Sequence, residues 1–245
     1  MDSQATATLT AEPHSDVHAH PAHLRHHFET EEQQREAASF GMWLFLLTEI
    51  MFFGGLFAAY LIYRNWYHDA FVAASNTLSI TLGAINTAVL ITSGFCMALG
   101  VWAAEVRNKG LLVLFLVLTT FFGLAFLGVK VVEYKEKFEL HHVPGASFDI
   151  SKFVHPDDPK EKPLSVDMAQ KTQVYFSLYF AMTGMHAVHM IIGIVLLAGL
   201  TWKAHKGAYT NGYVAPIENF GLYWHFVDIV WIFLFPLLYL ISRHS

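Results

Sequence analysis

The chain has 245 residues, of which 54% are hydrophobic and 14% charged, and its formal net charge is -5 at pH 7. Ordinary soluble domains carry about 25% charged residues, so the composition excludes that class and favours a polytopic membrane protein. The single cysteine, Cys96, excludes disulfides, CxxC redox pairs, CxxCH haem attachment and cysteine metal clusters within this chain.

Residues 1–39 are polar, contain six histidines and turn acidic at ETEEQQRE. Because so few apolar residues are present, we predict a disordered, solvating tail. The six histidines offer metal ligands in principle, but nothing in the sequence fixes their geometry; they are His14, His18, His20, His23, His26 and His27.

Five apolar stretches follow, at residues 40–63, 78–103, 111–132, 174–201 and 220–241. Each reaches the roughly 20 residues that a helix needs to cross a bilayer. A membrane β-barrel would instead show alternating segments of about ten residues. The sequence therefore predicts an all-α fold, a five-transmembrane-helix bundle forming one membrane domain over residues 40–245.

The segment 133–173 is the only sizeable loop between the predicted spans, and HHVPGASF and HPDDPKEKP within it are rich in turn formers. We expect it to cover a partner rather than to enclose a site. Lysine and arginine in the turns at 104–110 and 202–219 favour a cytoplasmic amino terminus, whereas the lysines of the long loop argue the opposite. The charge rule alone leaves the orientation open.

Ionisable residues lie inside the predicted spans: Glu49 within WLFLLTEIMFFGG, His186 and His189 on the fourth span, and His225 and Asp228 on the fifth. A charged side chain there costs roughly 2.5 to 3.5 kcal/mol on insertion scales, so such residues face the bundle interior. Bundle metal sites of the carboxylate-bridged kind need paired Glu-x-x-His units, which no span supplies. We therefore expect an interhelical polar network without a metal, in which His186 or His189 is a hydrogen-bond partner of Glu49.

Aromatic residues crowd the last span, in YWHFVDIVWIFLF. Tyrosine and tryptophan are enriched at membrane interfaces. We accordingly predict that Tyr223, Trp224 and Trp231 contact lipid or anchor the helix at an interface.

Three stretches resemble subunit III of the haem-copper oxidases. YWHFVDIVWIFLFPLLY (223–239) is similar to the family's last helix, YWHFVDVVWLFLY, and Glu218 stands where the family has a glutamate just before it. YFAMTGMHAVHMIIG (179–193) is similar to FFxxTGxHGxHVxxG, with Ala187 in place of the usual glycine. FGMWLFLLTEIMFFGGLFAAY (40–60) resembles the helix that carries a membrane-embedded glutamate, and Glu133 with Tyr134 matches an EY pair.

The resemblance implies the five-helix bacterial form of the family, whose full-length members have seven helices. It implies an accessory, non-catalytic subunit of a cytochrome c oxidase that reduces oxygen to water and pumps protons, with Glu49 as the membrane-embedded acid and Glu218 in the polar network. Haem and copper would belong to partner subunits, and phospholipid would be bound. Partners would be subunit I directly, subunit II, and small subunits or a respiratory supercomplex, with no nucleic acid.

The resemblance also implies a multi-pass protein of the bacterial inner (plasma) membrane, with the amino terminus cytoplasmic and the long loop and carboxyl terminus periplasmic. The loop is longer than the family's connection. Three alternatives stay open: a quinol oxidase subunit III, a nitric oxide reductase accessory protein, and, from a different class, a free-standing proton-coupled transporter. A transporter ordinarily shows two related halves, which this sequence does not.

Overall fold

The computed structural model describes residues 27–145, 148–156, 162–209 and 212–241, and within these ranges the regular structure is helical, with no strand. Five helices are long and apolar enough to cross a membrane, so the predicted all-α bundle with five membrane helices is confirmed. The helices are α1 (Glu31–Trp66), α2 (His68–Asn76), α3 (Ile80–Glu105), α4 (Lys109–Glu139), α5 (Ser151–Val154), α6 (Val166–His205) and α7 (Ala215–Tyr239).

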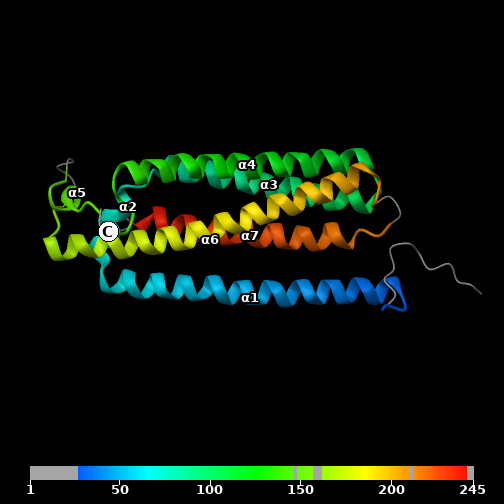
Figure 1. Ribbon diagram of the computed structural model, residues 1–245, viewed down its shortest axis with the longest axis horizontal. Helices are drawn as coiled ribbons and strands as arrows, with labels where there is room; N and C mark the ends of the chain where they lie inside the picture. The colour runs from blue at the N-terminus through cyan, green and yellow to red at the C-terminus, as the bar shows by residue number, and fades with distance from the viewer. Residues whose placement is uncertain (1–26, 146–147, 157–161, 210–211, 242–245) are drawn as a thin grey trace, which may run out of the picture.

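The five long helices run side by side along the longest axis of the molecule (Figure 1). Helix α3 packs on α4 and α7, and α4 also packs on α6, while α1 contacts α6, α7 and the short α2. Helix α7 is central, since 56% of its membrane span is buried inside the structure, whereas the figure for α1 is 17%. The short helices α2 and α5 lie together at one end of the bundle (Figure 1).

Helix α1 begins nine residues before the predicted span. The Thr30 hydroxyl accepts a hydrogen bond from the Gln33 amide at 3.1 Å, and Glu31 and Glu32 follow in the first turn. A hydroxyl cap and early acids both stabilise a helix start. The predicted disordered tail therefore extends too far, because residues 31–39 are helical; its histidines from His14 to His26 lie outside the described residues.

The predicted loop 133–173 contains the ends of two helices. Helix α4 continues to Glu139, and α6 already begins at Val166 behind Ser165, whose hydroxyl accepts from the Met168 amide at 3.3 Å. Between them lies α5, whose Phe153 is buried. The connection between α4 and α6 is consequently shorter than the predicted loop, and its described part contains a short helix.

Helix α2 was not expected, because residues 64–77 resemble a simple connection. Its nine residues bury Ala70, Phe71 and Ala74 on one face. The Phe71 ring lies 5.4 Å from the Tyr60 ring of α1, and the Lys137 ammonium of α4 donates to the Thr77 carbonyl at 2.5 Å. These contacts hold the connection between α1 and α3 against the end of the bundle.

The aromatic residues of α7 are part of the core. Trp224 and Trp231 are fully buried, so the prediction that they contact lipid is wrong for these two residues. Tyr223 is 5% exposed and lines a groove beside α1. Their polar atoms find partners inside the bundle: the Trp224 indole donates to the Ser93 hydroxyl at 3.2 Å, and the Trp231 indole donates to the Thr87 hydroxyl at 3.0 Å. A buried indole N–H requires such a partner, which α3 supplies.

Two glycines make room for the Trp224 ring. A Cβ atom at Gly193 of α6 would lie 2.8 Å from the ring, and one at Gly123 of α4 would lie 3.1 Å from it. Real Cβ atoms rarely approach a neighbour so closely. The central tryptophan thus fixes the spacing of α4, α6 and α7.

Candidate functional site

Glu49 has a direct partner on another helix. Glu49 of α1 and His189 of α6 meet at 3.0 Å between the carboxylate Oε2 and the imidazole Nε2. Their side chains are only 19% and 12% exposed. The Phe53 ring lies 5.3 Å from the His189 ring, and the Tyr223 hydroxyl donates to the His189 carbonyl at 2.8 Å, which fixes this turn of α6.

The other ring nitrogen determines where the protons lie. His189 Nδ1 is 2.9 Å from the Met185 carbonyl oxygen, which can only accept, so Nδ1 carries a hydrogen. Nε2 then either accepts from a protonated Glu49 or donates, as part of an imidazolium, to a carboxylate. In both arrangements one proton is shared between the two side chains and the pair is neutral overall. A neutral pair avoids the cost of an isolated charge inside a membrane.

The pair lies on the wall of a groove between α1, α6 and α7 with a volume of about 640 Å³. Most of its lining is apolar, including Phe45, Ile192 and Leu196, and Lys203 lies near the carboxyl end of α6. Such a groove can accept an apolar chain beside a polar group.

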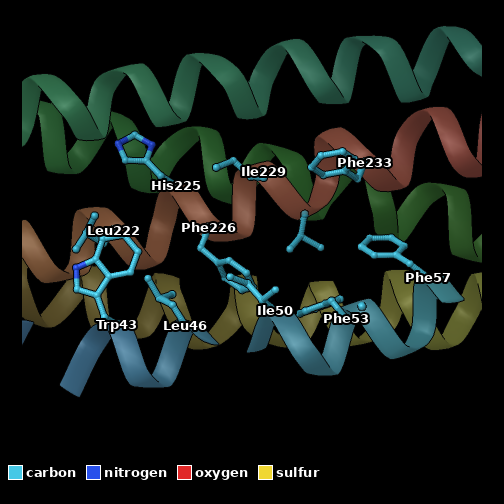
Figure 2. A pocket seen from close by; sticks show the side chains of 12 residues that line it. Trp43, Leu46, Ile50, Phe53, Phe57, Leu222, His225, Phe226, Ile229 and Phe233 are labelled. Atoms are coloured by element: carbon cyan, nitrogen blue, oxygen red, sulfur yellow. The ribbon is translucent and has the colours of Figure 1, made fainter. Parts of the chain in front are cut away.

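A second groove of about 540 Å³ lies on another side of α1, between this helix and α7. Figure 2 shows Trp43, Ile50 and Phe53 rising from α1 toward α7, with Phe226 pointing back toward α1. His225 is the ionisable residue among the described lining residues, and its ring points away from α1 (Figure 2).

His186 does not join this pair. It is 1% exposed, and its ring packs against Phe126 at 5.4 Å and Trp231 at 5.2 Å. Among the described residues neither of its ring nitrogens has a hydrogen-bond partner. Of the two histidines that the sequence left open as partners of Glu49, the structure therefore selects His189.

His225 and Asp228 face α3 rather than the Glu49 pair. A Cβ atom at Gly94 would collide with the Asp228 carboxylate and lie 3.5 Å from His225 Nδ1. Asp228 is 6% exposed. Gly94 therefore permits the close approach of α7 to α3 at this level.

Glu218 lies at the start of α7 and pairs with Arg35 of α1 at 3.0 Å. Next to it Gln34 donates to the Tyr213 hydroxyl at 2.8 Å, and the Ser39 hydroxyl lies 3.4 Å from the Asn219 side-chain oxygen. These contacts join the amino-terminal end of α1 to α7. The single polar network predicted from the sequence is thus divided among separate places in the bundle.

A buried ion pair in α4 was not expected from the sequence. Lys130 and Glu133 of α4 meet at 2.9 Å with side chains that are 4% exposed, and Lys130 also donates to the Tyr239 hydroxyl at 2.9 Å. Glu133 accepts from Tyr239 and, at 2.9 Å, from Tyr179. The Lys130 ammonium lies 4.7 Å from the centre of the Trp231 ring. A lysine three residues before a glutamate at the end of an apolar span was the available signal.

The side-chain geometry bears on metal binding. Among the described residues, no group of three or more His, Cys, Asp or Glu side chains is arranged to hold a metal ion. What the described polar residues do offer is hydrogen bonding between helices and, at Glu49 and His189, a shared proton.

The chain is similar to known oxidase subunits. Residues 164–243 match the family model described as cytochrome c oxidase subunit III. The chain is 31% identical over 204 residues to cytochrome c oxidase subunit 3 of Thermostichus vulcanus, covering 83% of this chain and 87% of that protein. It is 30% identical over 203 residues to the same subunit of Synechocystis sp., covering 82% and 75%. It is 23% identical over 209 residues to cytochrome bo(3) ubiquinol oxidase subunit 3 of Buchnera aphidicola, covering 85% and 96%.

Proposed function

Because the chain belongs to the cytochrome c oxidase subunit III family, we propose that it acts as the accessory, non-catalytic subunit III of a proton-pumping cytochrome c oxidase. Membership of this family makes it a multi-pass membrane component of a haem-copper oxidase, an oxidoreductase complex. Its role in that complex is to stabilise the catalytic subunit I, to bind lipid and to support proton uptake.

The Glu49–His189 pair is the observation that supports the role in proton uptake. It holds one proton between two side chains inside a membrane-spanning bundle, 3.0 Å apart and beside an open groove. A proton-sharing pair of this kind can exchange its proton without leaving a bare charge in the apolar region. This chemistry assists a neighbouring proton pathway without requiring a redox centre in this chain.

Lipid binding is supported by the two grooves beside α1. Both are lined mainly by apolar side chains and are large enough for hydrocarbon chains, at about 640 and 540 Å³. We propose that phospholipid acyl chains occupy them, and that the haem and copper of the complex are held by its other subunits.

We propose a bacterial plasma-membrane location with a cytoplasmic amino terminus, which places α2, α5 and the α4–α6 loop on the periplasmic side. The short basic turns support this orientation. Subunit I is the direct partner, with subunit II and small subunits or a supercomplex beyond it. Family membership favours an oxidase subunit over a free-standing transporter.

Cytochrome c is the electron donor that we propose, because the relatives from Thermostichus vulcanus and Synechocystis sp., at 31% and 30% identity, are cytochrome c oxidase subunits. Relatives named as quinol oxidase subunits, at 23% and 28% identity, keep a quinol donor as the second candidate. Sequencing the co-purifying subunit II decides between them. A paired-cysteine copper site indicates cytochrome c, and a subunit II without it indicates quinol.

The accessory role is tested by substitutions of Glu49 in the assembled complex, reconstituted into vesicles. Glu49→Gln keeps the size and hydrogen bonding of the side chain but removes its titratable proton, whereas Glu49→Ala removes both. We expect Glu49→Gln to assemble normally with a modestly changed number of protons pumped per electron, and Glu49→Ala also to weaken retention of this chain. Oxygen consumption is expected to survive in both variants.

His68→Gln is the matched control, because this histidine is exposed on α2, away from the pair. It should leave both pumping and assembly unchanged. Loss of oxygen reduction in a fully assembled Glu49→Gln complex would show that the acid is an obligatory proton carrier, and the accessory role would be refuted.

A further inference from the structure

The connection between α4 and α6 folds around one histidine. The His142 ring is 1% exposed and lies among three phenylalanine rings, with centroid distances of 5.0 Å to Phe176, 5.3 Å to Phe153 and 6.2 Å to Phe148. Phe176 belongs to α6 and Phe153 to α5, while Phe148 precedes α5 in the loop. The imidazole is therefore the centre of the contact that closes the loop over the bundle end.

We propose that His142 is a pH-sensitive latch: the neutral imidazole holds residues 148–156 of the α4–α6 loop closed on the end of the bundle, and its protonation releases them. The latch responds to the pH of the compartment that this loop faces. Only the identification of that compartment as the periplasm depends on the proposed function.

The three phenylalanine rings form an apolar cage around His142, which is an unfavourable environment for a charged imidazole. Within the described part of the chain, neither ring nitrogen of His142 makes a hydrogen bond. Burial lowers the pKa of His142 to about 4, and the cations Lys137 of α4 and Lys152 of α5 act in the same direction. Asp149 opposes this effect, and His141 adds to it weakly. The element α6 contributes the apolar Phe176 ring.

The described loop packs through Phe153 and its apolar neighbours, and it has backbone hydrogen bonds of its own. The Asp149 amide donates to the His141 carbonyl at 3.1 Å, and the Leu164 amide donates to the Phe153 carbonyl at 2.9 Å. Asp149 also accepts from the Ser151 amide at 2.8 Å, but this bond is local. The loop also contacts α6 directly, through the Phe148 and Phe153 rings at 5.7 and 6.3 Å from Phe176 and through the Gln173 amide, which donates to the Gly145 carbonyl at 3.3 Å. A charged His142 buried beside these rings would weaken their packing, because it has no polar partner among the described residues.

The sign of the pH effect follows from the lowered pKa. The open loop binds a proton near the ordinary histidine value of about 6.5, whereas the closed loop does so near 4. The contribution of His142 to closure is complete above about pH 6.5 and is lost as the pH falls from there toward 4. Linkage predicts that the opening equilibrium rises about 70-fold between about pH 7.5 and about pH 4.5.

Amide hydrogen exchange of residues 148–155 in the purified membrane complex measures this opening, after correction for the intrinsic pH dependence of exchange. The protection of the wild type against exchange is expected to fall by the factor that linkage predicts. The fall should occur between about pH 6.5 and pH 4. His142→Phe and His142→Leu keep an apolar group in the cage and cannot titrate, so their protection should not vary with pH. His141→Asn removes the exposed neighbouring histidine, at a φ of 55° that asparagine accepts, and should behave as the wild type.

Three results would overturn the latch. One is wild-type protection that does not change across the window, and another is a change outside it. The third is a pH-dependent loss in either His142 variant as large as that of the wild type, because a different group would then control the loop.

Discussion

Removal of the Lys130 ammonium tests whether the buried ion pair of α4 holds the bundle together. In Lys130→Met the Glu133 carboxylate stays buried without its cation, since the two side chains are each 4% exposed and 2.9 Å apart. Breaking such a pair from one side costs about 3 to 5 kcal/mol of unfolding free energy. Glu133 keeps the hydroxyl donors of Tyr179 and Tyr239, so we expect a loss near the lower end, about 3 kcal/mol.

The double variant Lys130→Met/Glu133→Gln removes both charges and keeps an oxygen that accepts from the two tyrosines. It should recover more than half of the lost stability, because no bare charge remains buried. Lys135→Met is the matched control on the same helix. This lysine is 76% exposed and lies 3.8 Å from Glu139, so its loss should cost at most about 1 kcal/mol.

Thermal unfolding of the purified chain in detergent can be followed through Cys96, which is the only cysteine and is 7% exposed. A thiol-reactive dye labels it only on unfolding. A loss of about 3 kcal/mol corresponds to a fall in Tm of roughly 6 to 12 °C for a chain of this size. The reasoning is refuted if Lys130→Met lowers stability no more than Lys135→Met does. It is also refuted if the double variant loses the sum of the losses measured separately for Lys130→Met and Glu133→Gln.

Further tests address packing, orientation and cofactors. Gly193→Ala should lose about 1 to 3 kcal/mol in the same assay, because the new methyl group would lie 2.8 Å from the Trp224 ring. Gly199→Ala has open space at that position and should be nearly neutral; equal losses would contradict the packing argument. Periplasm-dependent reporters should be active after Ser245 and inactive near Lys109, and the reverse pattern would invert the proposed orientation. The isolated chain should hold no stoichiometric haem or copper, and one tightly bound haem per chain in an absorption spectrum would contradict the accessory role.

Apolar length made the membrane helices predictable, but not their ends. The runs at 40–63 and 174–201 lie within α1 and α6. Both helices begin earlier than the runs, at amino-terminal ends capped by the hydroxyls of Thr30 and Ser165. Helix α2 was not predicted because it is only nine residues long and is stabilised by contacts with α1 and α6. Tertiary contacts of this kind leave little trace in local hydropathy.

The polar residues were identified more readily than their partners. Spacing placed His186 and His189 on one span, but the rotation of α6 decides that His189 reaches Glu49 while His186 packs on Phe126. Lys130 was overlooked because it lies near the end of its span, where a lysine can reach the interface, yet Glu133 holds it inside the bundle. Which side of a helix faces which neighbour is a property of the packed bundle.

The place of α1 in the bundle has a consequence for biogenesis. Glu49 of α1 is synthesised 140 residues before its hydrogen-bond partner His189. At translation rates of about 5 to 20 residues per second, the delay is roughly 7 to 28 seconds. During that time α1 has neither α6 nor α7 beside it, although these helices provide most of its contacts. The insertion machinery or an assembly factor must therefore shelter Glu49 until the fourth membrane helix arrives, and the newborn chain is most vulnerable to quality-control proteolysis in that interval.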